Sequence, residues 1–135
     1  MDTCIFCKIV RKKTPAYIIY EDKLTMAFLD KYPQSRGHLQ LIPKKHCLYV
    51  YEIPQMGEFF TIAQKIIRVI IPVLNAEYVT LATFGMQVRH AHLWIVPQYR
   101  QEVRVTEGAY GISDPQALKQ IGELLRNKLL GGGVV

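Results

Sequence analysis

The sequence contains two short motifs whose residue types could bind a metal or carry out chemistry. Cys4 and Cys7 form a Cys-x-x-Cys motif, and His90 and His92 are separated by one residue in the stretch GMQVRHAHLWIVPQ. A Cys-x-x-Cys motif indicates half of a metal site or a redox pair. A redox pair normally lies at a strand-to-helix turn, and no strand precedes Cys4, so a metal site is favoured. Imidazoles serve as metal ligands, nucleophiles or proton carriers.

The histidine pair lies in a stretch that has the two-residue alternation of a β-strand. Alternation over residues 87–97 places His90, His92 and Trp94 on one face, with mostly apolar side chains on the other. Successive side chains on one face of a strand are about 7 Å apart. Surface histidines or hydrogen-bonded core histidines are the structural alternative. The spacing, together with the Cys-x-x-Cys motif, favours a functional pair.

The elements that must position these residues are mostly strands. Residues 55–71 repeat apolar side chains at helical spacing, and Pro72 is expected to end or kink that helix. Gly85 predicts a tight turn, so the last two strands should form an antiparallel hairpin. The expected strands span residues 16–22, 24–30, 38–43, 77–84 and 87–97, and the other helices span residues 4–12 and Asp114, as N-cap, to about Leu130. This order favours an α+β fold, an antiparallel sheet with helices on one side.

Length and composition restrict the class of protein. The 135 residues suffice for one domain, which we expect to span residues 1–135. The net charge of +6 comes from dispersed basic residues, which indicates a solvated surface with at most a modest bias toward small anionic ligands and does not predict a nucleic-acid groove. Three cysteines argue against a disulfide framework. No apolar run is long enough to cross a bilayer and the start does not resemble a signal peptide, so we expect a cytoplasmic protein that binds no membrane.

Three stretches of the chain resemble the histidine triad (HIT) family of nucleotide-binding proteins. They are TCIFCKIVRKKTPAYIIYED, MAFLDKYPQSRGHLQLIPKKH and VRHAHLWIVP, in matching order and spacing over residues 3–97. The resemblance implies one HIT-like domain with a five-stranded antiparallel sheet, one long central helix and a C-terminal helix. It also implies a homodimer whose sheets join, and a site for a purine nucleotide or nucleotide derivative on one face of the sheet.

In this family the middle histidine of a His-x-His-x-His motif is the nucleophile, and His92 occupies that position. The resemblance implies that His92 attacks the α-phosphorus of a phosphoramidate or a dinucleoside polyphosphate. Water then releases the nucleoside monophosphate from the covalent nucleotidyl-histidine. A neutral imidazole suits this role because an acceptor can hold one nitrogen while the other attacks.

The resemblance also implies a ligand set for the metal. Family members with an N-terminal Cys-x-x-Cys motif hold a structural zinc ion, and the matching residues here are Cys4, Cys7, His46 and His90. Two thiolates and two imidazoles make a closed site, which stabilises a fold without taking part in chemistry. Cys47 follows His46 directly and is expected to point away from the zinc.

Other matching positions imply contacts to the nucleotide. Asp30 matches the carboxylate that binds the ribose, and the residues that enclose the base match Ile5, Phe6 and Phe28. Core packing is the structural alternative for both phenylalanines. Gln87 is a candidate contact of the phosphate, although alternation places it on the face away from the two histidines.

The sequence departs from the family at two places. Trp94 replaces the third histidine of the triad, and the segment before the triad is several residues shorter, with Thr83 where an asparagine is expected. An indole N–H can donate a hydrogen bond but cannot transfer a proton near pH 7. Loss of one preorganised donor costs about 10²–10³ in rate, and a missing general acid about 10²–10⁴. The related galactose-1-phosphate uridylyltransferases have glutamine at the third position, so this change alone does not exclude chemistry.

Three functions are therefore compatible with the sequence. His92 and Asp30 favour a nucleotide hydrolase or nucleotidyl transferase. Trp94 is expected to pack where the third histidine would contact the phosphate. This replacement and the short segment before the triad favour two alternatives. These are a catalytically weak or inactive nucleotide-binding protein and a zinc-stabilised interaction module.

Overall fold

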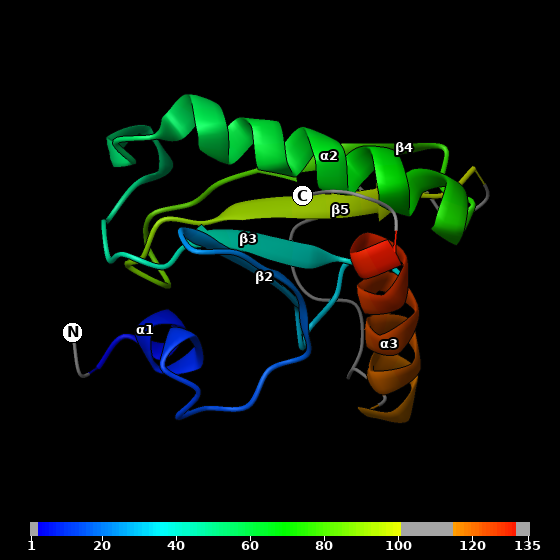
Figure 1. Ribbon diagram of the computed structural model, residues 1–135, viewed down its shortest axis with the longest axis horizontal. Helices are drawn as coiled ribbons and strands as arrows, with labels where there is room; N and C mark the ends of the chain where they lie inside the picture. The colour runs from blue at the N-terminus through cyan, green and yellow to red at the C-terminus, as the bar shows by residue number, and fades with distance from the viewer. Residues whose placement is uncertain (1–2, 101–114, 132–135) are drawn as a thin grey trace.

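The computed structural model describes residues 3–100 and 115–131, which form one antiparallel sheet flanked by helices (Figure 1). The strands lie in the order β1-β2-β3-β5-β4. Their bounds are β1 Ile18–Glu21, β2 Thr25–Leu29, β3 Leu39–Pro43, β4 Tyr78–Ala82 and β5 Leu93–Gln98. The helices are α1 Ile5–Val10, the 3-10 helix η1 Val50–Glu52, α2 Met56–Leu74 and α3 Pro115–Gly131. The predicted five-stranded α+β fold is confirmed.

The main core lies between the sheet and α2, which crosses one face of it (Figure 1). The buried residues of α2 recur at intervals of three and four and are Phe59, Ala63, Ile66, Ile70 and Leu74. They belong to the same cluster as Leu39 and Leu41, which lie on one face of β3 as alternation predicted. Burial of each large apolar side chain contributes about 1.5–3 kcal/mol. The helix continues past Pro72 and ends at Leu74, where Asn75 adopts the left-handed conformation at φ 57°.

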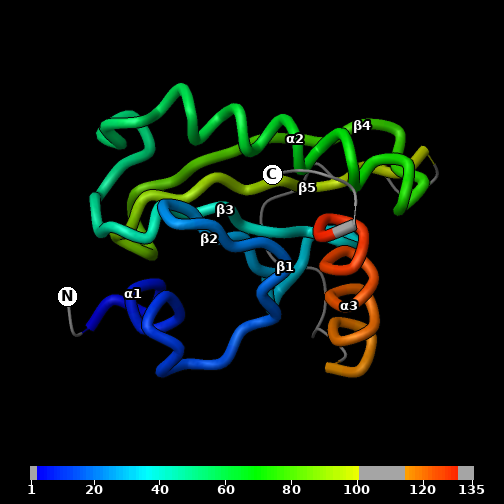
Figure 2. The backbone as a smooth tube through the Cα atoms, in the orientation of Figure 1, coloured from blue at the N-terminus to red at the C-terminus, as the bar shows by residue number. Residues whose placement is uncertain are grey.

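The C-terminal helix α3 packs beside β1 at one end of the sheet (Figure 2). Leu118, Leu125 and Leu129 contribute its buried face to the main core. The predicted end near Leu130 agrees with the observed one, whereas the predicted N-cap, Asp114, lies outside the described residues. None of the helices in the described ranges is long and apolar enough to cross a membrane.

Helix α1 packs on the face of the sheet opposite α2 and builds a second, smaller apolar cluster (Figure 1). The buried members of this cluster are Phe6, Ile9, Met26, Phe28 and Ile42. Because β2 and β3 are covered on both faces, all of their residues are buried. The expectation of helices on one side of the sheet is therefore wrong for α1. This helix is also shorter than the expected residues 4–12, and Lys12 follows it with φ 63°.

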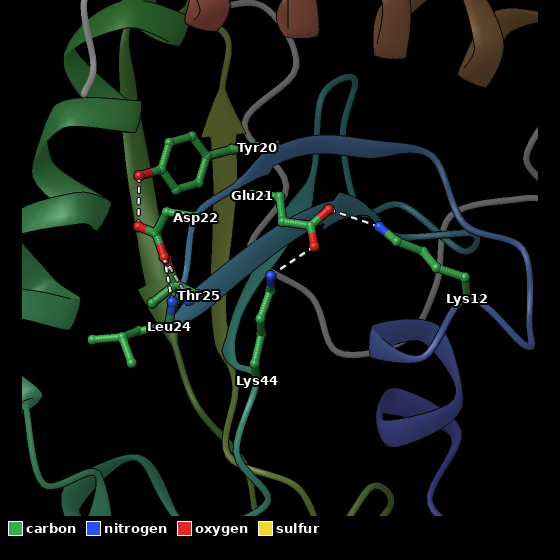
Figure 3. A network of polar contacts seen from close by, with 7 residues as sticks. All are labelled: Lys12, Tyr20, Glu21, Asp22, Leu24, Thr25 and Lys44. Atoms are coloured by element: carbon green, nitrogen blue, oxygen red, sulfur yellow. Dashed lines mark hydrogen bonds and ion pairs between the residues drawn. The ribbon is translucent and has the colours of Figure 1, made fainter.

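A network of polar side chains ties the end of α1 to the sheet (Figure 3). Glu21, the last residue of β1, accepts from Lys12 at 2.7 Å and from Lys44, which follows β3, at 2.6 Å. The hydrogen bonds from these two lysines lower the pKa of Glu21. Asp22 accepts from two backbone N–H groups of the β1–β2 turn. These contacts hold the ends of three strands and α1 together, next to the segment that carries His46.

The strand expected to carry the histidines is shorter than predicted. β5 begins at Leu93, so His90 and His92 lie in the connection of residues 83–92 and not in a strand of residues 87–97. Every residue from His90 to Leu93 is buried, which breaks the alternation of a strand with one exposed face. The pleat of a strand therefore does not set the directions of these two side chains.

The connection between β4 and β5 is longer than the predicted hairpin turn. The two strands pair antiparallel, as expected, with Ala82 opposite Trp94. Beyond Ala82 the chain leaves the sheet and packs on Tyr49, whose ring would lie 2.7 Å from a Cβ at Gly85. Gly85 is needed for this close approach and not for a tight turn.

A candidate metal centre beside a candidate active site

Four cysteine and histidine side chains converge at the start of α1. Cys4 Sγ lies 3.3 Å from His90 Nδ1, and Cys7 Sγ lies 3.3 Å from His46 Nδ1. The two Nδ1 atoms are 3.2 Å apart, and all four donor atoms lie within 4.8 Å of one another. Ligands of a tetrahedral zinc are about 3.3–3.8 Å apart, given Zn–S near 2.3 Å and Zn–N near 2.0–2.1 Å. The donor types and their spacing therefore fit a zinc ion.

Three segments that are far apart in the sequence supply these donors. Cys4 is the N-cap of α1, and its Sγ accepts the backbone N–H of Cys7 at 3.3 Å. His46 follows β3, and His90 precedes β5. Cys47 lies outside this group and packs against the main core. A metal bound here would link α1 to both segments.

The protonation of the cluster suits a cation. The Nε2 atom of His90 lies 2.8 Å from the carbonyl oxygen of Pro43, so it carries the proton and donates. Nδ1 is left with a lone pair that faces the cysteines, as a metal ligand requires. Burial lowers the pKa of His90, which keeps it neutral. Burial, reinforced by Cys4, raises the pKa of Cys7 to about 11, so a thiolate at this position needs a neighbouring cation.

His92 is oriented by backbone groups on both sides of its ring. Its Nδ1 donates to the carbonyl oxygen of His90 at 2.9 Å, which leaves the lone pair on Nε2. Nε2 accepts from the backbone N–H of Phe84 at 3.2 Å. The side chain is buried between the rings of Phe6 and Phe84, whose centroids lie 6.0 and 6.3 Å from that of His92. The lone pair of His92 Nε2 is thus held in one orientation, and the backbone N–H of Phe84 covers it.

Phe84, which follows the shortened end of β4, lies outside the motifs that indicated the other site residues. The hydroxyl of Thr83 donates to the carbonyl oxygen of His92 at 2.6 Å and draws the connection onto the histidine. This contact places the Phe84 N–H against Nε2. The one feature of the sequence that marked this region was that the segment before the triad is shorter than in the family. No local pattern predicts a contact between residues eight apart in an irregular connection, such as Phe84 and His92.

Trp94, at the third triad position, belongs to an aromatic cluster. Its ring lies edge-on to His38 at 4.6 Å and to Phe84 at 4.8 Å, measured between ring centroids. It lies opposite Gln40 in the pairing of β3 with β5. The position expected to supply a proton donor in the family therefore holds a half-buried indole that cannot transfer a proton near pH 7.

Asp30 lies just after β2 and is held by hydrogen bonds on both carboxylate oxygens. Oδ1 accepts from the backbone N–H of Tyr32 at 2.8 Å, and Oδ2 accepts from Gln40 Nε2 at 2.9 Å. His38 Nε2 is 3.6 Å from Oδ2, beyond hydrogen-bond range. Burial lowers the pKa of His38 to about 4, against the opposing effect of Asp30, so this contact is not a salt bridge. His38 Nδ1 accepts from the backbone N–H of Gln34 at 3.0 Å, so Nε2 carries the proton.

The residues predicted to surround the base lie at different depths. Phe6 and Phe28 are buried and pack edge to face with their centroids 5.3 Å apart. Phe6 also touches the rings of both triad histidines. Ile5 is 41% exposed, and Gln87 is exposed in the connection before the triad. The two phenylalanines thus pack in the smaller apolar cluster next to the triad histidines, whereas Ile5 and Gln87 are exposed.

Comparison with known proteins shows which sequences this chain is similar to. The model of the family described as HIT domain matches residues 11–101. A protein of Schizosaccharomyces pombe named adenosine 5′-monophosphoramidase is 33% identical over 135 residues, covering 94% of this chain and 98% of its own. A protein of Arabidopsis thaliana named adenylylsulfatase is 29% identical over 106 residues, covering 73% of this chain and 54% of its own.

Solved structures agree with these sequence relationships. The crystal structure of a zinc-bound histidine triad family protein from Mycobacterium smegmatis has a TM-score of 0.76 and 31% identity, covering 96% of this chain and 95% of that one. A HIT-like protein from Bartonella henselae has a TM-score of 0.82 and 26% identity, covering 96% and 98%. The fold, the histidine and cysteine positions and these matches agree, and the chain belongs to the HIT domain family.

Proposed function

We propose that this protein is a HIT-type hydrolase or nucleotidyl transferase that acts on the α-phosphate of a nucleotide derivative through a covalent nucleotidyl-His92. The observation that carries the proposal is the hydrogen bond from His92 Nδ1 to the carbonyl of His90, which leaves Nε2 as the nucleophile. Relatives named adenosine 5′-monophosphoramidase and adenylylsulfatase support an adenine nucleotide derivative as substrate. Dinucleoside polyphosphates are a second substrate class for the same chemistry.

The reaction has two displacement steps. In the first, the Nε2 lone pair attacks the α-phosphorus, and the P–N or P–O bond to the leaving group breaks with its electrons going to that group. The His90 carbonyl stabilises the positive charge on the imidazole ring through the Nδ1 hydrogen bond. In the second, water attacks phosphorus, the N–P bond breaks, and the nucleoside monophosphate leaves. A basic leaving group takes its proton from solvent, because Trp94 cannot supply one.

The backbone N–H of Phe84 has two roles in this proposal. It lies 3.2 Å from Nε2 and must move off that nitrogen before attack. A phosphorus bonded to Nε2 brings its oxygens into the same region, where this N–H can donate to one of them. The exposed side chain of Gln87, in the same connection, is a further candidate contact of the phosphate.

The nucleotide would lie on the side of the sheet that α1 covers. Asp30 would accept from the ribose hydroxyls, and Ile5, Phe6 and Phe28 would contact the base. Trp94 would lie beside the phosphate. Two observations support this pose. Phe6 contacts the rings of both His92 and Phe28. Gln40 donates to Asp30 and lies opposite Trp94 in the pairing of β3 with β5.

Zinc in this proposal has a structural role. The four residues that would hold it are Cys4, Cys7, His46 and His90. Bound there, the ion supplies a cross-link between α1, the segment after β3 and the connection before β5. His90 would thus hold the metal and, through its carbonyl, also hold His92.

Hydrolysis of adenosine 5′-phosphoramidate tests the proposed function. The wild type should release AMP, and His92→Ala should abolish release while the zinc content stays unchanged, because His92 is not among the proposed ligands. Product chromatography and elemental analysis of the same samples provide the two readouts. Gln64→Ala, on the exposed face of α2, is the matched control and should retain full activity. Release of AMP by His92→Ala at the wild-type rate would falsify the covalent mechanism.

A catalytically inactive nucleotide-binding protein is the second candidate. The Phe84 N–H on Nε2 and the indole at Trp94 favour it. A zinc-stabilised interaction module without a nucleotide is the third. A thermal-shift titration with AMP separates them, because a ligand that binds only the folded state raises the midpoint. A shift without turnover supports the binding protein, and no shift supports the module.

A further inference from the structure

Gln40 is a buried polar residue whose amide contacts the carboxylate of Asp30. We propose that Gln40 is a positioning residue that aligns Asp30 with the two hydroxyls of a ribose, which makes the site selective for ribonucleotides over 2′-deoxyribonucleotides. This inference rests on the proposed function, since it assumes that a nucleotide binds beside His92.

The position of Gln40 in the sheet is unusual for a polar side chain. It lies in the middle of β3, opposite Phe28 of β2 and Trp94 of β5, with 9% of its surface exposed. Its neighbours Leu39 and Leu41 are fully buried. The side chain therefore sits in an apolar row that crosses three strands and reaches the candidate active site at Trp94.

Hydrogen bonding fixes the orientation of the Gln40 amide. A carboxylate only accepts, so the amide nitrogen faces Asp30 Oδ2, at 2.9 Å, and the amide oxygen faces elsewhere. That oxygen is buried and has no hydrogen-bond partner within the described part of the chain. A buried carbonyl without a donor costs free energy, and an apolar side chain of similar volume would avoid this cost. Stability alone does not account for a glutamine here, whereas its contact with Asp30 does.

The contacts of Asp30 leave room for two further donors. A carboxylate has about four lone-pair positions. The Tyr32 N–H takes one on Oδ1 and the Gln40 amide takes one on Oδ2, while His38 Nε2 at 3.6 Å takes none. About one position on each oxygen remains, which matches the paired 2′ and 3′ hydroxyls of a ribose. A 2′-deoxyribose would leave one of these positions unused.

Loss of the Gln40 amide should loosen this arrangement. Asp30 Oδ2 would lose its only direct donor among the described residues. The N–H at His38 Nε2 lies 3.6 Å from Oδ2 and has no hydrogen-bond partner in the same part of the chain. Asp30 could then turn toward His38 and away from the sugar. The 2′-hydroxyl would lose more binding free energy than the rest of the nucleotide. The ratio of AMP affinity to 2′-deoxy-AMP affinity should therefore fall further than the affinity for 2′-deoxy-AMP.

Calorimetric titration of the full-length protein with AMP and 2′-deoxy-AMP tests the proposal. The wild type should bind AMP about tenfold or more tighter, as expected for a hydrogen bond to a charged group. Gln40→Leu should reduce this ratio to about threefold or less without lowering the thermal midpoint. Gln64→Leu, on the exposed face of α2, is the matched control and should keep the wild-type ratio. Gln40→Met, of equal length, replaces the leucine variant if that variant melts early.

A double-mutant cycle with Asp30→Asn separates positioning from a direct contact. If Gln40 acts through Asp30, Gln40→Leu should leave the ratio unchanged once Asp30 is already replaced. An equal effect in both backgrounds would overturn the positioning role. If the wild type binds AMP but neither Gln40→Leu nor Gln40→Met changes the ratio of AMP affinity to 2′-deoxy-AMP affinity, the inference is overturned and the proposed function stands. Binding of neither nucleotide by the wild type would overturn both.

Discussion

At the scale of single residues, two backbone groups control His92. The carbonyl of His90 leaves a lone pair on Nε2, the proposed nucleophile, and the N–H of Phe84 covers that lone pair. Opening the second contact costs about 0.5–1.5 kcal/mol, the net value of an ordinary hydrogen bond. Absence of a general acid costs about 3–5 kcal/mol, equivalent to a factor of 10²–10⁴ in rate. Trp94 is therefore the larger obstacle to catalysis with a basic leaving group.

Replacement of Trp94 tests this comparison. Trp94→His should raise the hydrolysis rate of adenosine 5′-phosphoramidate by about 10–10³, because an imidazole can protonate the departing amine. The rate with adenylyl sulfate should change much less, because sulfate leaves without a proton. Trp94→Phe is the control and should raise neither rate, and product chromatography measures all three variants. If Trp94→His does not raise the rate with the phosphoramidate, the connection of residues 83–92, which is shorter than in the family, limits catalysis more than Trp94 does.

At the scale of elements, apolar periodicity predicted the parts of the fold that pack on a continuous face. The helix expected over residues 55–71 and the strand expected over residues 38–43 differ from α2 and β3 by at most a few residues. α2 keeps a buried stripe that repeats at helical spacing, and β3 alternates between two apolar clusters. Such patterns are local, so the sequence alone contains them.

Periodicity failed where contacts between distant segments set the course of the chain. The strand expected over residues 87–97 begins only at Leu93. Before it, the side chains of His90 and His92 hydrogen-bond to the backbone carbonyls of Pro43 and His90, and neither contact belongs to the pairing pattern of a sheet. Both histidines nevertheless touch Phe6, as a shared face would predict. The clustering of Cys4, Cys7, His46 and His90 was predictable from the family resemblance, because these four residues lie in matched motifs. The contact of Phe84 lies in the segment that departs from the family, so no motif indicated it.

Helix α1 should depend on the proposed zinc ion more than any other described helix. It is only six residues long, too short to be stable in isolation, and it begins at the two cysteines. Elemental analysis should find one zinc per chain, and His90→Ala should lose the metal and lower the free energy of unfolding by several kcal/mol. Cys47→Ala is the control and should keep both metal and stability. Metal-free wild type with undiminished thermal stability would rule out this role.

At the scale of the whole molecule, β4 is an edge strand of the sheet that residues 3–100 and 115–131 form. Within the described residues, α3 packs beside β1 at the other edge, while β4 exposes Tyr78 and Leu81. An unpaired edge strand readily pairs with another chain. We therefore propose that two copies join their sheets through β4 and form the expected homodimer.

Light scattering at low micromolar concentration tests this assembly. The mass should be about twice the 15.5 kDa of one chain. Leu81→Lys should shift the protein toward the monomer, because it places a charge on the joined edge. Leu130→Lys, at an exposed position on α3, should not. A wild-type mass near 15.5 kDa would refute the dimer.

The crystal structure of the complex with AMP is the most direct test of the nucleotide site. We expect the α-phosphorus within about 3.5 Å of His92 Nε2, a reactive distance, with the Phe84 N–H turned from that nitrogen to a phosphate oxygen. The ribose hydroxyls should lie on Asp30. A cavity of about 850 Å³ between the β1–β2 turn and the start of α2 is the competing location. AMP bound there, with the Phe84 N–H still on Nε2, would contradict the assignment of His92 as the nucleophile.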